Sequence, residues 1–143
     1  MIRGNAELVI SEFGRLSGSG FGLGKASVEW VEGFIERLRG NASDEADGGR
    51  TRIAAVLACY LGEAIIAEAG GHWDETEGGE LGIRFDNNNW CFPFAKVAKQ
   101  FADGTEGGES ILSFYIVSTT IAARQGSGRL SDGPISSKTK IES

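Results

Sequence analysis

The segment Thr51–Ala69 is apolar on every side of a helical wheel, and this feature most constrains the fold. Its large apolar residues are Ile53, Val56, Leu57, Tyr60, Leu61, Ile65 and Ile66. A surface helix shows one apolar stripe, whereas a helix that is apolar all round is stable only when it is buried. The sequence therefore predicts a central helix enclosed by the rest of the domain and ended by the Gly70–Gly71 pair.

Two amphipathic helices are expected before this central helix. The first covers residues 6–16 and stops at Gly18, and a glycine-rich loop follows to Gly24. The second begins with Ser27 as its N-cap and ends near Gly40. Its outward side carries Glu29, Glu32, Glu36 and Arg37. Residues 41–49 are polar and contain glycine, which predicts a linker.

Three short strands with turns between them are expected next. The strands cover residues 72–76, 81–85 and 89–92, and residues 77–80 and 86–89 form the turns, because Gly and Asn tolerate positive φ. Pro93 closes the last strand, since proline has no N–H for a ladder hydrogen bond. This pattern predicts a three-stranded antiparallel meander.

Two helices complete the predicted domain. A short one follows Pro93 and stops at Gly104, with Lys96, Lys99 and Gln100 facing outward. The last runs over residues 109–125, although its β-branched residues leave a strand as the alternative. The fold class is thus α+β, in the order α-α-α-β-β-β-α-α, as one domain over residues 1–125. Residues 126–143 are nearly devoid of apolar side chains, which predicts a disordered tail.

Length and charge restrict the function classes. The chain has 143 residues, 41% of them hydrophobic, which suits one domain without metal or disulfide support. It lacks the long apolar run of a membrane span or a signal peptide, so we expect a cytoplasmic protein with no membrane partner. Its net charge of −6 repels phosphate backbones, and nucleic acid is not expected as a partner.

Three residues are weak candidates for catalysis: Glu63, His72 and Cys91. Glu63 lies in the middle of the apolar helix, so its carboxylate needs a partner such as Arg84, a lysine or an indole N–H. If it has none, burial raises its pKa and makes it a general acid or base. His72 is the only histidine. It could activate Cys91 as a thiolate nucleophile if the strands brought the two together.

No metal or cofactor site is predicted. Cys59 and Cys91 stand in apolar segments without disulfide or zinc spacing, and we expect both to be reduced. The Asp86–Asn89 turn lacks the glycine and glutamate of a calcium loop. The glycine-rich loop before Lys25 departs from a phosphate-binding loop at Ser19 and Ala26.

Two groups of acidic residues on predicted connections are candidates for contact with a basic protein partner. Such groups are usually solvated turns, but a patch of one sign speeds association and selects partners. The first group is Asp74, Glu75, Glu77 and Glu80, and the second is Asp103, Glu106 and Glu109. Tryptophan side chains could anchor a contact beside the first group. The candidate binding residues are Trp73, Asp74, Glu75, Glu77, Glu80 and Trp90.

Five short motifs resemble a family of small bacterial proteins classed only as a domain of unknown function, and the resemblance covers about residues 5–125. The motifs are Ser27–Arg37, Tyr60-Leu-Gly-Glu63, Gly70-Gly-His-Trp73, Phe92-Pro-Phe-Ala-Lys-Val97 and Ser110-Ile-Leu-Ser-Phe-Tyr115. The layout is also loosely similar to proteins that neutralise bacterial toxins. The resemblance implies a fold but no established activity, and it carries no catalytic residue over to this chain.

Two functions remain open from the sequence. One is a non-catalytic, immunity-like or regulatory binding module of a bacterial cytosol. The other is a small hydrolase or small-molecule-binding enzyme that gathers Glu63, His72 and Cys91 around one cleft.

Overall fold

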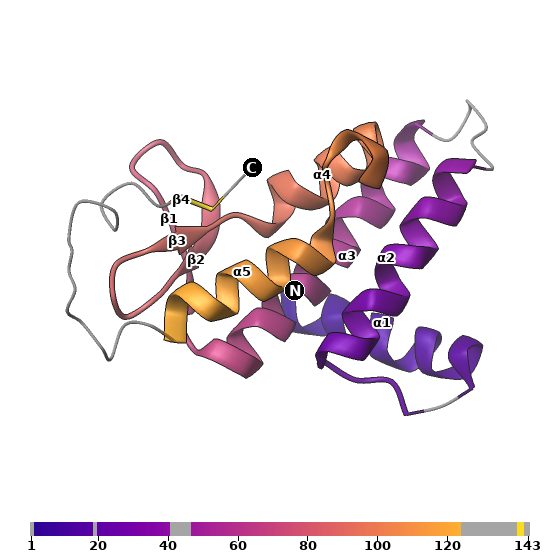
Figure 1. The fold of residues 1–143 in the computed structure, drawn as a ribbon, viewed down its shortest axis with the longest axis horizontal. Coiled ribbons are helices and arrows are strands. Elements are labelled where there is room, and N and C mark those ends of the chain that lie inside the picture. The colour runs from indigo at the N-terminus through magenta and orange to yellow at the C-terminus, as the bar shows by residue number, and fades with distance from the viewer. Residues whose placement is uncertain (1, 19, 41–46, 124–139, 142–143) are drawn as a thin grey trace.

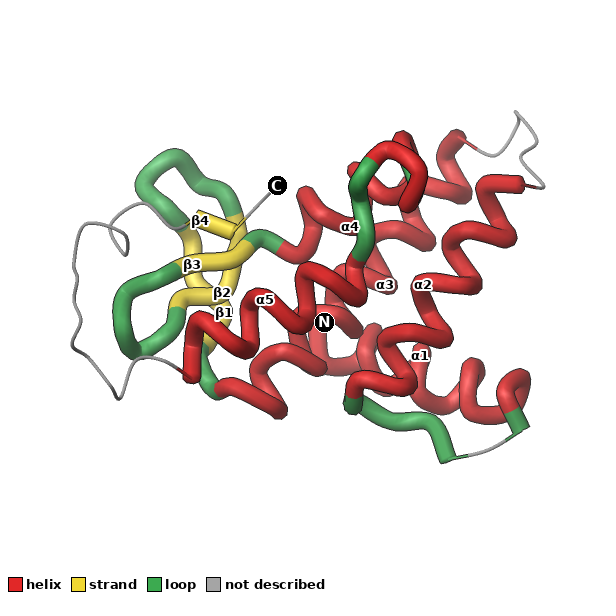
Figure 2. Tube along the Cα trace, in the orientation of Figure 1, coloured by secondary structure: helices red, strands yellow, loops and turns green. Residues whose placement is uncertain are grey.

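The computed structural model describes residues 2–18, 20–40, 47–123 and 140–141, and it has the predicted α+β fold (Figure 1). The helices are α1 (Ile2–Ser17), α2 (Lys25–Gly40), α3 (Asp47–Ala69), α4 (Pro93–Asp103), the 3-10 turn η2 (Thr105–Gly107) and α5 (Ile111–Ala123). The strands are β1 (His72–Glu75), β2 (Leu81–Arg84), β3 (Trp90–Cys91) and β4 (Lys140–Ile141). The strands gather at one end of the molecule, and the helices occupy the rest (Figure 2).

The middle of helix α3 is the buried spine that its composition predicts, whereas Ile53, one of its large apolar residues, is exposed near its start. The helix packs against all four of the other α-helices. Six consecutive residues, 57–62, are buried, which is possible only when neighbours cover every side of the helix. The helix ends where Gly70 and Gly71 take φ values of 84° and 92°, a conformation that favours glycine.

The sheet is an antiparallel meander whose two faces differ in burial. β1 pairs with β2 and β2 pairs with β3 in the predicted order. Ile83, Phe85 and Cys91 are buried on the face that joins the core. His72, Arg84 and Trp90 lie opposite one another across the three strands, on the other face, because side chains alternate along a strand. His72 and Arg84 are exposed there.

The sheet is attached to the spine through Trp73. A Cβ atom added to Gly62 of α3 would overlap the indole ring of Trp73, so the ring rests directly on the helix backbone. The indole Nε1 donates a 2.8 Å hydrogen bond to Glu63 Oε2. The Trp73 and Phe94 rings also pack in an edge-to-face arrangement, with centroids 6.0 Å apart.

Two predicted boundaries are wrong. Ser27 is not an N-cap, because α2 begins two residues earlier, at Lys25. The Ser27 hydroxyl instead accepts a hydrogen bond from the Gly22 N–H in the preceding loop. Helix α3 starts at Asp47, inside the predicted 41–49 linker, whose first six residues lie outside the described residues.

The structure also refines the prediction for the last helix and the tail. α5 is a helix and not a strand, and its residues up to 123 are described. Within the segment expected to be disordered, Lys140 and Ile141 form β4, which pairs in parallel with β3. Residues 126–139 and 142–143 lie outside the described part of the chain. Among the described helices, none has the length and hydropathy to cross a membrane.

The contact between Gly62 and Trp73 predicts opposite effects for two similar substitutions. Gly62→Ala should lower the free energy of unfolding by about 1–3 kcal/mol, because the new methyl group overlaps the indole ring. Gly33→Ala in α2 is the control, since its methyl group would meet only the flexible Arg37 side chain, at 3.4 Å. It should leave stability unchanged or raise it by up to about 1 kcal/mol. Urea unfolding of both variants measures the difference, and equal effects would contradict the contact.

Candidate functional site

The three candidates for catalysis lie in separate environments. The Glu63 carboxylate is half-buried and accepts the Trp73 indole hydrogen bond, one of the partners expected from the sequence. His72 is exposed, with its Nε2 3.7 Å from Asp74 Oδ2. Cys91 is buried on the core face of the sheet, opposite to the face of His72. The alternation of side chains along the strands therefore keeps His72 and Cys91 from forming a nucleophile pair.

Both cysteines are buried free thiols. Burial raises the pKa of Cys91 to about 12, and the nearby Ser118 hydroxyl offsets part of this rise. Burial also raises the pKa of Cys59, whose sulfur accepts a hydrogen bond from the Asn5 side-chain amide at 3.7 Å. A thiol with a raised pKa is protonated at neutral pH and is a poor nucleophile.

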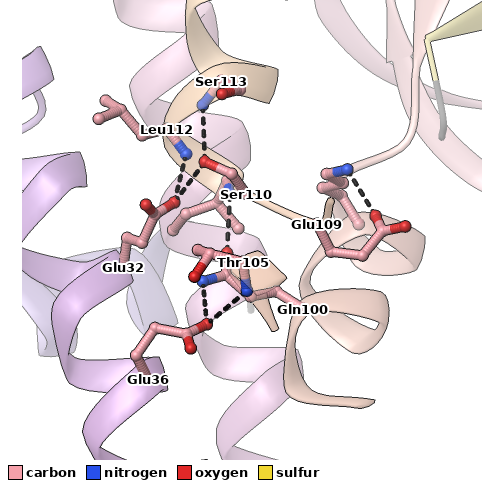
Figure 3. Close-up of polar contacts among 10 residues, drawn as sticks. Glu32, Glu36, Gln100, Thr105, Glu109, Ser110, Leu112 and Ser113 are labelled. Atoms are coloured by element: carbon pink, nitrogen blue, oxygen red, sulfur yellow. Dashed lines mark hydrogen bonds and ion pairs between the residues drawn. The ribbon is translucent and has the colours of Figure 1, made fainter. Parts of the chain in front are cut away.

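A polar network joins α2 to the start of α5 (Figure 3). Glu32 Oε1 accepts hydrogen bonds from the Ser110 hydroxyl at 2.6 Å and from the Leu112 N–H at 3.0 Å. The Ser110 oxygen in turn accepts the Ser113 N–H at 3.1 Å. The first N–H groups of a helix have no partner within the helix, and a negative charge is favourable there. Glu32 and Ser110 together cap α5.

One turn further along α2, Glu36 binds both α4 and η2, and Arg39 binds the end of α4. Glu36 Oε2 accepts from the Gln100 amide at 2.7 Å and from the Thr105 N–H at 3.2 Å. Gln100 is completely buried, and its Oε1 accepts the Ile111 N–H at 2.8 Å. Arg39 donates to the carbonyl oxygen of Phe101 at 3.0 Å, near the carboxyl end of α4, where a positive charge is favourable.

This network corrects the predicted orientation of four side chains. Glu32, Glu36, Lys96 and Gln100 were expected to face outward, but the two glutamates are half-buried and the other two are buried. Lys96 Nζ forms a 2.6 Å ion pair with Glu109 Oε1, which removes Glu109 from the second acidic group. The spacing of Glu32, Glu36 and Arg39, which places them on one side of α2, was the available signal.

The first acidic group remains on the surface of the β1–β2 hairpin. Asp74 is paired with Arg84, with Oδ2 3.3 Å from Arg84 Nη1. Glu75, Glu77 and Glu80 are exposed and have no ion pair with another described residue. We call these three residues the acidic tip. No other stretch of six consecutive described residues carries three exposed carboxylates that lack such a pair.

The two tryptophans among the candidate binding residues have different positions. Trp73 is turned toward α3 and ties the sheet to the core. Trp90 is half-buried on the outer face of the sheet, where it stacks on Phe92 with centroids 5.8 Å apart and planes 8° apart. The Arg84 guanidinium lies 6.0 Å from the centroid of the Trp90 ring. Of the two, only Trp90 lies on the outer face of the sheet.

The glycine-rich loop is held by its own neighbours. The Tyr60 hydroxyl of α3 donates a 2.7 Å hydrogen bond to the Gly22 carbonyl, while the Gly22 N–H binds Ser27. Burial raises the pKa of Tyr60 well above its usual value, so this hydroxyl stays a donor. In the part of the chain that the structure describes, no three His, Cys, Asp or Glu residues are grouped to hold a metal ion.

Comparison with known proteins gives no relatives: no family model, no curated protein and no solved structure matches this chain.

The cap on α5 predicts unequal effects for two glutamates of α2 that looked equivalent in the sequence. Glu32→Ala should lower the free energy of unfolding by about 2–3 kcal/mol, because the Ser110 hydroxyl and the Leu112 N–H lose their acceptor. Glu29→Ala, at an exposed position of the same helix, should change it by less than about 0.5 kcal/mol. Chemical denaturation measures both, and a neutral Glu32→Ala would contradict the capping role.

The raised pKa of Cys91 predicts a loss of stability at alkaline pH. The thiol ionises near pH 9.0 in the unfolded chain but near 12 in the folded protein. Between these values the unfolded state releases a proton that the folded state keeps, so stability falls as pH rises. Cys91→Ala should reduce the slope of unfolding free energy against pH by up to about 1.4 kcal/mol per unit. Urea unfolding between about pH 8 and pH 11 tests this, and parallel slopes for the two proteins would refute it.

Proposed function

We propose that this protein is a non-catalytic binding module, immunity-like or regulatory, that takes a basic protein partner in the bacterial cytosol. The observation that carries the proposal is the acidic tip. Three carboxylates with no ion pair to another described residue lie within six residues of one hairpin, at the end of the molecule away from the helices α1 and α2 (Figure 1). Their combined negative field attracts and orients a partner of opposite charge.

The distribution of the acidic side chains supports this proposal. Glu32, Glu36 and Glu109 are engaged in hydrogen bonds or ion pairs that hold helices together. The acidic tip makes no such contact with another described side chain. Folding therefore accounts for the inner carboxylates, whereas the outer three remain available to a partner.

The outer face of the sheet supplies a suitable anchor at the other end of β1, where Arg84 and Trp90 lie across from His72. Trp90 and Arg84 belong to the residue types that most often carry binding energy at protein interfaces. The Arg84 side chain is already oriented by Asp74 and by the Trp90 ring, so it loses little conformational freedom when a partner binds. In the immunity-like form of the proposal, the partner is a basic toxin that this surface covers.

Binding through the acidic tip predicts salt-sensitive capture that depends on these three residues. The immobilised protein should retain a basic partner from bacterial lysate at about 50 mM salt and release it at about 500 mM. The variant E75Q/E77Q/E80Q should lose it. The control variant E7Q/E29Q/E68Q changes the net charge equally at three other exposed sites and should retain it. Equal retention by the two variants, or no salt-sensitive capture by the unaltered protein, overturns the proposal.

A further inference from the structure

One side of the β1 main chain has no partner among the described strands. The sheet order is β1-β2-β3-β4, so among the described residues β1 pairs with β2 alone. The Thr76 N–H donates to the Glu80 carbonyl at 2.9 Å, which fixes the side of β1 that faces β2. Because this direction alternates along a strand, the N–H and C=O groups of Trp73 and Glu75 face the open edge.

One of these groups is already occupied within the strand itself. The Glu75 N–H donates a 2.8 Å hydrogen bond to Asp74 Oδ1. No other described residue accepts a hydrogen bond from the Trp73 N–H, and none donates one to the carbonyl oxygens of Trp73 and Glu75. An open edge with main-chain donors and acceptors is a template on which another extended segment can pair. In the free protein, the Asp74 side chain thus occupies the Glu75 N–H, one of the main-chain donors with which an added strand would pair.

We infer that the partner adds an extended, lysine- or arginine-rich segment to the open edge of β1, as a further strand of the sheet. This inference rests on the proposed function and specifies its mode of binding. The main-chain groups of Trp73 and Glu75 provide the pairing, and charge selects the occupant. Asp74 and the acidic tip flank the edge, so a basic strand is attracted to it.

The same charges disfavour a second copy of this chain as the occupant. Two β1 edges that paired with each other would bring Asp74 and Glu75 of one copy next to those of the other. Like charges at opposed positions destabilise a strand pair. The edge is therefore protected against self-association and remains open to a basic strand.

Synthetic peptides test the inference on the unaltered protein. The probe is a peptide of about eight residues that alternates lysine and threonine, with blocked ends. It should slow amide hydrogen exchange of Trp73 by about tenfold or more at saturation, as followed by NMR. A peptide of equal charge, with alternate backbone nitrogens methylated, should bind about tenfold more weakly, because it lacks the donors for pairing. Equal binding of the two peptides, or no protection of Trp73, overturns strand addition.

A pair of variants separates strand pairing from charge. Glu75→Pro removes an N–H that does not face β2, and its ring blocks the edge, while Glu75→Gln removes the same charge and keeps the N–H. The proline variant should bind the lysine peptide about tenfold more weakly than the glutamine variant. Thermal melting checks that both variants are folded. If the proline variant is unfolded, the comparison of the lysine peptide with the methylated peptide on the unaltered protein tests strand pairing.

The outcomes distinguish this inference from the proposed function. Salt-sensitive capture that requires the acidic tip, together with equal binding by Glu75→Pro and Glu75→Gln, leaves the binding function standing and removes strand addition. Loss of the salt-sensitive capture itself removes the binding function.

Discussion

One stripe of charged side chains on α2 fixes the connection between α4 and α5. Glu32 lies at the amino end of α5, and Arg39 lies at the carboxyl end of α4. Each charge has the sign that its helix end favours. Between them, Glu36 binds Gln100, whose amide oxygen accepts from the first residue of α5. The connection between the two helices contains three glycines and lacks a strong apolar anchor, so these polar contacts fix its course.

A second constraint places the sheet relative to the helices. The Trp73 ring requires the missing side chain of Gly62, and its N–H satisfies the half-buried Glu63 carboxylate. One aromatic residue of an edge strand thus packs on the helix backbone at Gly62 and donates a hydrogen bond to the neighbouring carboxylate. With the inner face of the sheet held in this way, His72 and Arg84 on the outer face are exposed, and β1 pairs only with β2 among the described strands.

The sequence predicted the fold well because its strongest signals are local. A helix that is apolar all round, a glycine pair at its end and glycine or asparagine turns between short alternating strands each specify their own segment. The orientation of Glu32, Lys96 and Gln100 could not be predicted in the same way. A periodic pattern ranks polar residues as outward, and only the tertiary approach of α2, α4 and the start of α5 provides them with buried partners. The separation of His72 from Cys91 follows from strand register, which the sequence alone specifies loosely.

Folding distributes the uncompensated negative charge of this chain unevenly over its surface. Carboxylates at helix ends and in ion pairs are compensated locally, so their fields are weak at a distance. The carboxylates of the acidic tip are not compensated by another described side chain, and their field extends about a Debye length of 8–10 Å into solvent. That range covers the edge of β1, which lies in the same hairpin. In the proposed mode of binding, long-range attraction and short-range main-chain pairing therefore act on the same few residues, so that the charge which attracts a basic segment also brings it to the edge with which it would pair.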